Sequence, residues 1–204
     1  MHVDIIDRLK NGIINKENSN DLARKIFLSY KTAVFKNEED LEFIIKDSIK
    51  NHLKVPFTSI QVSGSSKTGF SFFNKTLFTD GKSDLDISII SLDLYNQFLE
   101  VVHRETEAFS NLTVFPFYKG YPTDKQFIKN LQKGFINPFF MPTCKEKSEW
   151  LTFFRSLSNN YVKKFHSITG AIYSSEYFFE CKQAVCIEEF ERNIKAYDTL
   201  SSKI

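Results

Sequence analysis

The sequence predicts an α/β (α+β) fold, in which helices at both ends flank a small mixed β-sheet. Residues 58–63 and 84–91 alternate between apolar and polar side chains, which is typical of half-buried strands. Four apolar residues recur every fourth position and so form one stripe along a helix: Leu41, Ile45, Ile49 and Leu53. Strands in the first half of the chain and helical patterns on either side of them favour a mixed fold over an all-helical one.

A single domain accounts for the whole length of 204 residues, since a chain of this size buries most of its apolar surface in one core. We expect a helical N-terminal part over residues 1–56, a sheet core over 57–120 and a mainly helical C-terminal part over 121–204. No internal repeat or linker-like tract divides the chain.

The composition is that of a globular protein, with 42% hydrophobic and 25% charged residues. The net charge of +2 is too small for electrostatic capture of nucleic acid by the whole surface, although a local basic face is compatible with it. Cys144, Cys181 and Cys186 are an odd number of cysteines, so we expect free thiols. No apolar run is long enough for a membrane span, and Asp7 and Arg8 interrupt any N-terminal signal sequence, so we expect a cytoplasmic protein.

In the first third of the chain, Asn20 or Asp21 caps a predicted helix that runs to about Phe35. A second predicted helix begins after Asn37, and Pro56 ends it. The strand over 58–63 then leads directly into the small-residue segment 64–69.

Between the two strands, residues 70–83 are expected to form a loop or a ragged hairpin with the Asp80-Gly81 pair at its tip. The second strand leads into a predicted helix over 92–104, and residues 112–118 are a candidate third strand.

In the last third, glycines and prolines indicate loops around a short helix over residues 120–142. Thr143 and Glu146 have the spacing of a capping box, and the apolar pattern over 150–165 predicts a long helix after them. A cluster of polar residues, Ser174, Ser175 and Glu176, opens the last predicted helix.

The turn after the first strand is the first part of a candidate site. Such a turn exposes backbone N–H groups that cradle phosphate oxygens, and the start of a helix adds a favourable dipole. Its candidate nucleotide-binding residues are Gly64, Ser65, Ser66 and Lys67. Ser65 or Ser66 supplies a hydroxyl contact, whereas Lys67 is either a phosphate contact or a solvated residue of the turn.

The second part of the candidate site is the pair Asp84 and Asp86. Residues i and i+2 of a strand project from the same face, so these two carboxylates are expected to bind a common pair of divalent cations, for which Mg²⁺ is the expected metal. The alternative is a pair of solvated charges on a strand face. A phosphate cradle beside paired carboxylates is the equipment for attack on a nucleoside triphosphate, and Asp84 and Asp86 are then the catalytic residues.

The order of strand, Gly64-Ser65 turn and Asp84-x-Asp86 strand resembles the DNA polymerase β-like nucleotidyltransferase superfamily. The resemblance covers residues 59–91, less than a fifth of the chain. It implies that Gly64 and Ser65 hold the triphosphate, that Asp84 and Asp86 ligate Mg²⁺, and that a nucleoside monophosphate moves to an acceptor hydroxyl of RNA, protein or a small molecule.

The helices before the first strand also look like those of bacterial minimal nucleotidyltransferases and oligonucleotide cyclases. Small stand-alone members of the superfamily often serve in toxin–antitoxin or antiviral modules. The resemblance therefore implies a defence role and a partner protein in a defence complex.

This chain departs from the pattern of the superfamily at two points. Eighteen residues separate Ser65 from Asp84, more than the usual ten or so, and must loop out beside the site. The superfamily also has a third carboxylate on a later strand, as general base and metal ligand, and residues 112–118 contain none. The acids considered as substitutes are Glu105, Glu107, Asp124 and Glu176.

Two other classes of function stay open. A degenerate nucleotidyltransferase-like subunit would bind nucleotide or partner proteins in a larger complex without transferring anything. A plain RNA-binding module would use a basic stripe at Lys125, Lys129 and Lys133, for which a solvated helix face is the preferred interpretation. Adjacent aromatics such as Phe139-Phe140 are expected in the core rather than stacked on bases.

Overall fold

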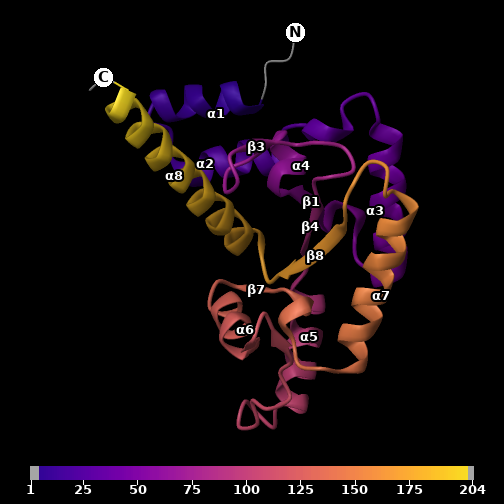
Figure 1. The fold of residues 1–204 in the computed structure, drawn as a ribbon. Coiled ribbons are helices and arrows are strands. Elements are labelled where there is room, and N and C mark those ends of the chain that lie inside the picture. The colour runs from indigo at the N-terminus through magenta and orange to yellow at the C-terminus, as the bar shows by residue number, and fades with distance from the viewer. Residues whose placement is uncertain (1–4, 202–204) are drawn as a thin grey trace.

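A computed structural model describes residues 5–201, so the predicted domain limits at residues 1 and 204 lie outside it (Figure 1). Its centre is a four-stranded sheet in the order β1-β4-β8-β7. The strands are β1 (Ile60–Ser63), β4 (Leu85–Ile90), β8 (Ile168–Tyr173) and β7 (Phe135–Ile136). β4 is antiparallel to β1 and parallel to β8, and β7 is antiparallel to β8. The expected mixed α/β fold is confirmed.

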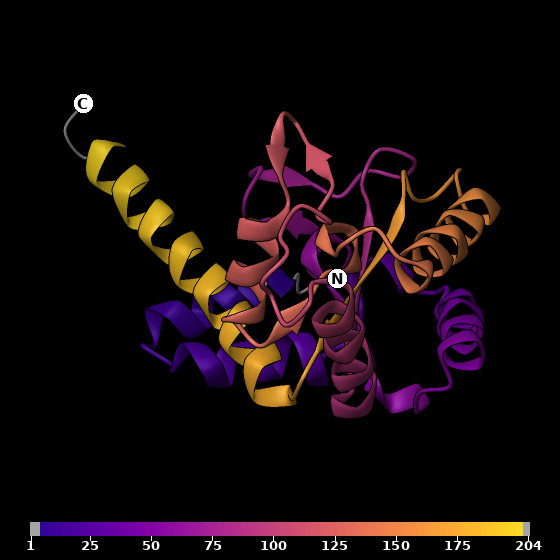
Figure 2. The same ribbon diagram turned by 90° about the horizontal axis from the view of Figure 1, so that it is seen from below.

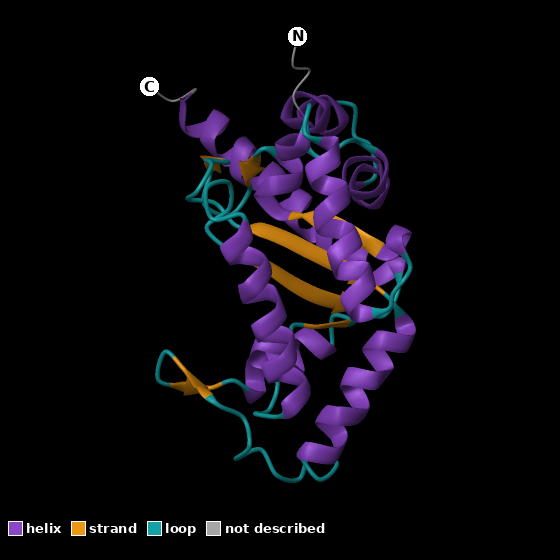
Figure 3. Cartoon of the chain, turned by 90° about the vertical axis from the view of Figure 1, so that its right-hand side faces the viewer, coloured by secondary structure: helices purple, strands orange, loops and turns teal. Residues whose placement is uncertain are grey.

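The alternation along β4 gives the sheet one apolar and one polar face. Leu85, Ile87 and Ile89 are buried in the main core. Three helices contribute to that core: α3 (Glu39–Leu53), α5 (Leu92–Glu105) and α7 (Lys145–Asn160). The other face of β4 is directed toward α8 (Glu176–Ser201), and Figure 1 shows α3 and α7 on one side of the sheet with α8 on the other. Figure 3 shows helices that lie across one face of this sheet.

A second apolar core joins the N-terminal helices to α8. These helices are α1 (Ile5–Ile14) and α2 (Ser19–Ala23), and α2 continues as the π-helix η1 (Arg24–Ser29). Leu9, Phe27 and Phe179 are among its buried residues. The predicted continuous helix to Phe35 is wrong, because the chain becomes extended at Tyr30 and forms only the short 3₁₀ turn η2 (Ala33–Phe35).

Residues 70–83, called the flap below, form a hairpin and a second turn. The hairpin pairs β2 (Phe70–Ser71) with β3 (Thr76–Leu77), so its tip lies at residues 72–75. The expectation of a tip at Asp80-Gly81 is wrong. Gly81, at φ +68°, lies in the second turn, where its N–H donates to the carbonyl oxygen of Lys164.

The predicted third strand over 112–118 is also wrong. Asn111 accepts hydrogen bonds from the N–H and hydroxyl of Thr113, which fixes a local turn. After it, β5 (Phe117–Tyr118) and β6 (Tyr121–Pro122) pair only with each other. The strand that pairs with β4 on the side away from β1 is β8. It comes from a segment between two helices that the sequence interpretation left unassigned.

The remaining elements are short. They are η3 (Phe57–Ser59), α4 (Gly64–Thr68), α6 (Asp124–Leu131) and η4 (Pro138–Phe140). The predicted capping box at Thr143 is absent, since α7 begins after Cys144 without a side-chain cap and ends at Asn160. The three cysteines are free, as expected. Among residues 5–201 no helix combines the length and the apolar character that crossing a bilayer requires.

Candidate functional site

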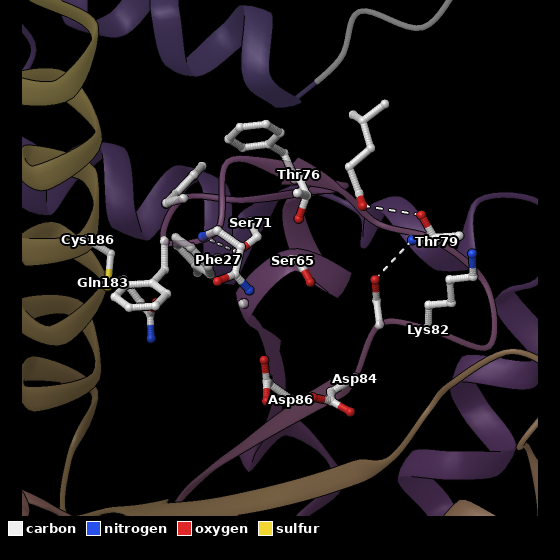
Figure 4. A pocket seen from close by; sticks show the side chains of 17 residues that line it. Phe27, Ser65, Ser71, Thr76, Thr79, Lys82, Asp84, Asp86, Gln183 and Cys186 are labelled. Atoms are coloured by element: carbon white, nitrogen blue, oxygen red, sulfur yellow. Dashed lines mark hydrogen bonds between the residues drawn. The ribbon is translucent and has the colours of Figure 1, made fainter.

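A pocket of about 470 Å³ lies between the end of β1, the start of β4, the flap and α8 (Figure 4). Four residues singled out by their sequence pattern line it: Gly64, Ser65, Asp84 and Asp86. Figure 4 shows Ser65 above the two carboxylates, with Gln183 and Cys186 of α8 at one side. Eighteen residues lie between Ser65 and Asp84 in the sequence, yet the turn and the aspartates meet at one cavity.

Hydroxyl groups from β8 and the residue before it hold the two carboxylates. Ser167 Oγ donates to Asp84 Oδ1 at 2.6 Å, and Thr169 Oγ1 donates to Asp86 Oδ1 at 3.1 Å. Thr169 is the residue directly opposite Asp86 in the parallel pairing of β4 with β8. The described residues place no Lys, Arg or His within ion-pair distance of either aspartate, so both keep oxygen atoms for another ligand.

The backbone at Gly64 leaves room for Asp86. Gly64 has φ +63°, and a Cβ at this position would overlap the carboxylate of Asp86. Ser63, which precedes α4, makes no side-chain cap; its hydroxyl hydrogen bonds to Ser88 Oγ at 2.9 Å instead. The N–H groups that open α4 are therefore left without a side-chain cap beside the carboxylates.

The pKa of Asp86 is raised to about 6, mainly by burial and also by the like charge of Asp84. The hydrogen bond from Thr169 and the nearby Lys182 ammonium oppose this shift in the pKa. The charged form of Asp86 thus lacks sufficient compensation from the protein itself, which is the electrostatic setting in which a cation binds well.

The donor set fits Mg²⁺, because two carboxylates, Asp84 directly before β4 and Asp86 within it, supply the hard oxygen ligands that this ion prefers. It is not a complete protein cage. Within residues 5–201, no three or more His, Cys, Asp or Glu side chains gather at a site that could hold a metal. Thr169 occupies the position on the neighbouring strand from which a third carboxylate would reach Asp86.

Ser66 and Lys67 do not reach the pocket. Ser66 is fully buried, and its hydroxyl donates to the carbonyl oxygen of Ser63. Lys67 is only 4% exposed, and its ammonium donates to the carbonyl oxygen of Tyr30. Burial, and then the charge of Lys46, lower the pKa of Lys67 to about 8. Lys67 was predicted to be either a phosphate contact or a solvated residue of the turn, and both alternatives are wrong. Its side chain instead links α4 to the N-terminal part of the chain through Tyr30.

The acids considered as a third carboxylate lie elsewhere. Glu105, at the end of α5, pairs with Arg104, and Glu107 lies in the turn that follows at φ +50°. Asp124 begins α6 and Glu176 begins α8, and none of the four lines the pocket.

Several residues that line the pocket or hold its carboxylates escaped the sequence interpretation. Ser167 and Thr169 belong to residues 166–173, where Ile168, Ile172 and Tyr173 carry the β-branched and aromatic signal of a strand. Lys82 of the flap and Gln183 of α8 also line the pocket, and no local pattern identifies them. Only the packing of α8 and the flap over the sheet brings them there.

None of the family models, curated proteins or solved structures compared with this chain matches it.

Proposed function

We propose that the protein is a Mg²⁺-dependent nucleotidyltransferase that binds a nucleoside triphosphate in this pocket. The observation that carries the proposal is the convergence of the Gly64-Ser65 turn and the Asp84-Asp86 pair on one cavity of about 470 Å³. That volume lies within the usual range for a small-molecule site.

In this proposal Asp84 and Asp86 hold Mg²⁺, and Ser167 and Thr169 fix the rotamers of the two carboxylates. Mg²⁺, when bound, neutralises charge on the phosphates and on the attacking and leaving oxygens. The N–H groups that open α4 and the hydroxyl of Ser65 bind phosphate oxygens, and Lys82 adds a positive charge at the flap. Residues of the flap and α8 line the pocket beside the bound nucleotide.

The test measures Mg²⁺-dependent incorporation of label from each of the four nucleoside triphosphates into total RNA and total protein. We expect Asp84→Asn plus Asp86→Asn to reduce the signal at least about 100-fold, because the variant keeps the shape of both side chains but loses the charges that hold the metal. The matched control is Asp80→Asn, an exposed flap aspartate outside the pocket, which should act as the wild type does. Equal incorporation by the double variant and the wild type would remove the proposal.

A second candidate is a protein that binds nucleotide without transferring it, as a subunit of a larger complex. The observation that favours it is Thr169, which stands opposite Asp86 where a carboxylate would act as general base. This candidate predicts Mg²⁺-dependent nucleotide binding, by calorimetry, that is lost in the double aspartate variant, together with no incorporation into any acceptor. A role in a bacterial toxin–antitoxin or antiviral module is a further proposal, supported by the resemblance alone.

A further inference from the structure

The hairpin of β5 and β6, residues 117–122, exposes large aromatic rings and is called the aromatic hairpin below. Phe117 is 75% exposed and Tyr121 is 77% exposed. The ring of Tyr118 meets the ring of Phe139, itself 40% exposed, edge to face at 5.0 Å. The expectation that Phe139 lies in the core is therefore wrong. Figure 3 shows the aromatic hairpin standing away from the body of the molecule.

The backbone of the aromatic hairpin forms a tight turn between its two strands. Its turn consists of Lys119 at φ +50° and Gly120 at φ +85°, two left-handed residues in succession, which suit a tight two-residue turn. Clustered exposed aromatic rings on a monomer mark a surface that binds something, since a single exposed ring needs no explanation but a group does.

The surrounding charge selects an anionic partner. Residues 111–143 contain four lysines and one acid, so this segment carries +3, more than the +2 of the whole chain. Lys119, Lys125, Lys129 and Lys133 are all exposed. The acid is Asp124 at the start of α6, and its Oδ1 is buried and turned away from solvent. Lys125 and Lys129 lie one turn apart on α6, which begins two residues after the aromatic hairpin ends.

We propose that the aromatic hairpin and the lysines beside it bind single-stranded nucleic acid. Exposed rings offer flat faces on which unpaired bases stack, and interspersed ammonium groups contact the phosphates between those bases. A duplex keeps its bases stacked inside and cannot use the rings in this way. Both components of such a site, aromatic faces and a local positive charge, occur together at this segment.

The position of the aromatic hairpin gives the strand a route to the pocket. Figures 2 and 3 both place the aromatic hairpin and the flap on the same side of the molecule. A strand held on the aromatic hairpin can extend toward the flap, and its terminal hydroxyl then becomes the acceptor. This acceptor role rests on the proposed nucleotidyltransferase function, whereas the binding itself does not.

The test is fluorescence anisotropy with labelled 20-nucleotide RNA and DNA single strands and with the matching duplexes. We expect the single strands to bind more tightly than the duplexes. Phe117→Ala plus Tyr121→Ala should weaken single-strand binding at least about fivefold per ring, since stacking contributes roughly 1–3 kcal/mol per base. Lys119→Ala, Lys125→Ala and Lys129→Ala together should lower the slope of log K against log salt by about 2.

Matched controls remove exposed groups of the same kind elsewhere. Phe43→Ala plus Tyr177→Ala removes two exposed rings, and Lys10→Ala, Lys145→Ala and Lys163→Ala removes three exposed charges. Both controls should bind as the wild type does. All the substituted side chains are on the surface, so circular dichroism should show unchanged folding.

The inference is overturned if no oligonucleotide binds, if duplexes bind as well as single strands, or if the hairpin variants bind as tightly as the controls. A surface that serves a protein partner instead would give the last of these results. Asp84→Asn plus Asp86→Asn should bind single strands normally. A wild-type protein that binds single strands but incorporates no label would refute the proposed activity and leave this inference intact.

Discussion

The carboxylate of Asp86 lies against the backbone of Gly64, in space that a Cβ on residue 64 would occupy. Since Gly64 also has φ +63°, two separate constraints disfavour a side chain at this position. The Gly64-Ser65 turn and the carboxylate of Asp86 are therefore in direct contact in the folded protein.

Gly64→Ala is expected to lower the free energy of unfolding by at least about 2 kcal/mol, from backbone strain and the overlap with Asp86 together. Gly120→Ala is the matched control: it also has positive φ, at +85°, but nothing lies within 4 Å of its Cβ, so strain alone of about 1 kcal/mol is expected. Urea denaturation measures both. Adding Asp86→Ala to Gly64→Ala should recover part of the loss, and equal losses for the two glycine variants would argue against the overlap.

Thr169→Asp is expected to make the protein more dependent on Mg²⁺. A third carboxylate opposite Asp86 repels the two already present, so the melting temperature in EDTA should fall below that of the wild type. In Mg²⁺ the same carboxylate becomes a ligand, and the increase in melting temperature on adding the ion should exceed that of the wild type. Thr169→Asn, which adds no charge, is the control. An unchanged response to Mg²⁺ would show that residue 169 does not face the ion.

Phe190 on α8 holds the flap in place. Its ring stacks on Phe72 at 4.9 Å and meets Phe70 edge to face at 6.0 Å. Phe190→Leu keeps an apolar side chain but loses these ring contacts, at a cost of about 1–2 kcal/mol. The flap should then open more often, and trypsin should cleave faster at the exposed Lys75 of its tip.

Phe73→Ala is the control for the flap, because Phe73 is 87% exposed and contributes little to folding. It should leave the rate of tryptic cleavage unchanged. If Phe190→Leu also leaves that rate unchanged, the stacked rings do not restrain the flap.

Lys67 makes stability depend on pH in the alkaline range. Its pKa is about 8 in the folded protein, below the ordinary value of 10.5, so the unfolded chain binds more protons between these two limits. The free energy of unfolding of the wild type should therefore rise with pH through this window, by at most about 1.4 kcal/mol per pH unit.

Lys67→Met removes the titrating group, so the difference in stability between wild type and variant should shift in favour of the wild type from pH 7.5 to pH 9.5. Urea denaturation at the two pH values measures the shift. Lys163→Met, at an exposed lysine, should show no such change in the difference. Parallel pH profiles for wild type and Lys67→Met would mean that the buried ammonium is fully compensated at neutral pH.

The candidate site could be predicted from the sequence only where its residues lie in continuous local patterns. Asp84 and Asp86 were recognisable because a period of two places both on the face opposite Leu85 and Ile87. Gly64 and Ser65 were recognisable because small residues followed a strand. Ser66 and Lys67 belong to the same tract, but one helical turn rotates them away from the pocket into the interior.

Sequence alone determined the mixed fold, the two strands that bracket the turn and the face on which both carboxylates lie, because period and turn chemistry are local properties of the chain. Tertiary structure decided which strand pairs with β4, and so placed Thr169 rather than an acid beside Asp86. Strand pairing depends on contacts between residues 83 positions apart, which no local pattern encodes. The tertiary structure also decided that α8 and the flap line the pocket, whereas the aromatic hairpin stays in solvent.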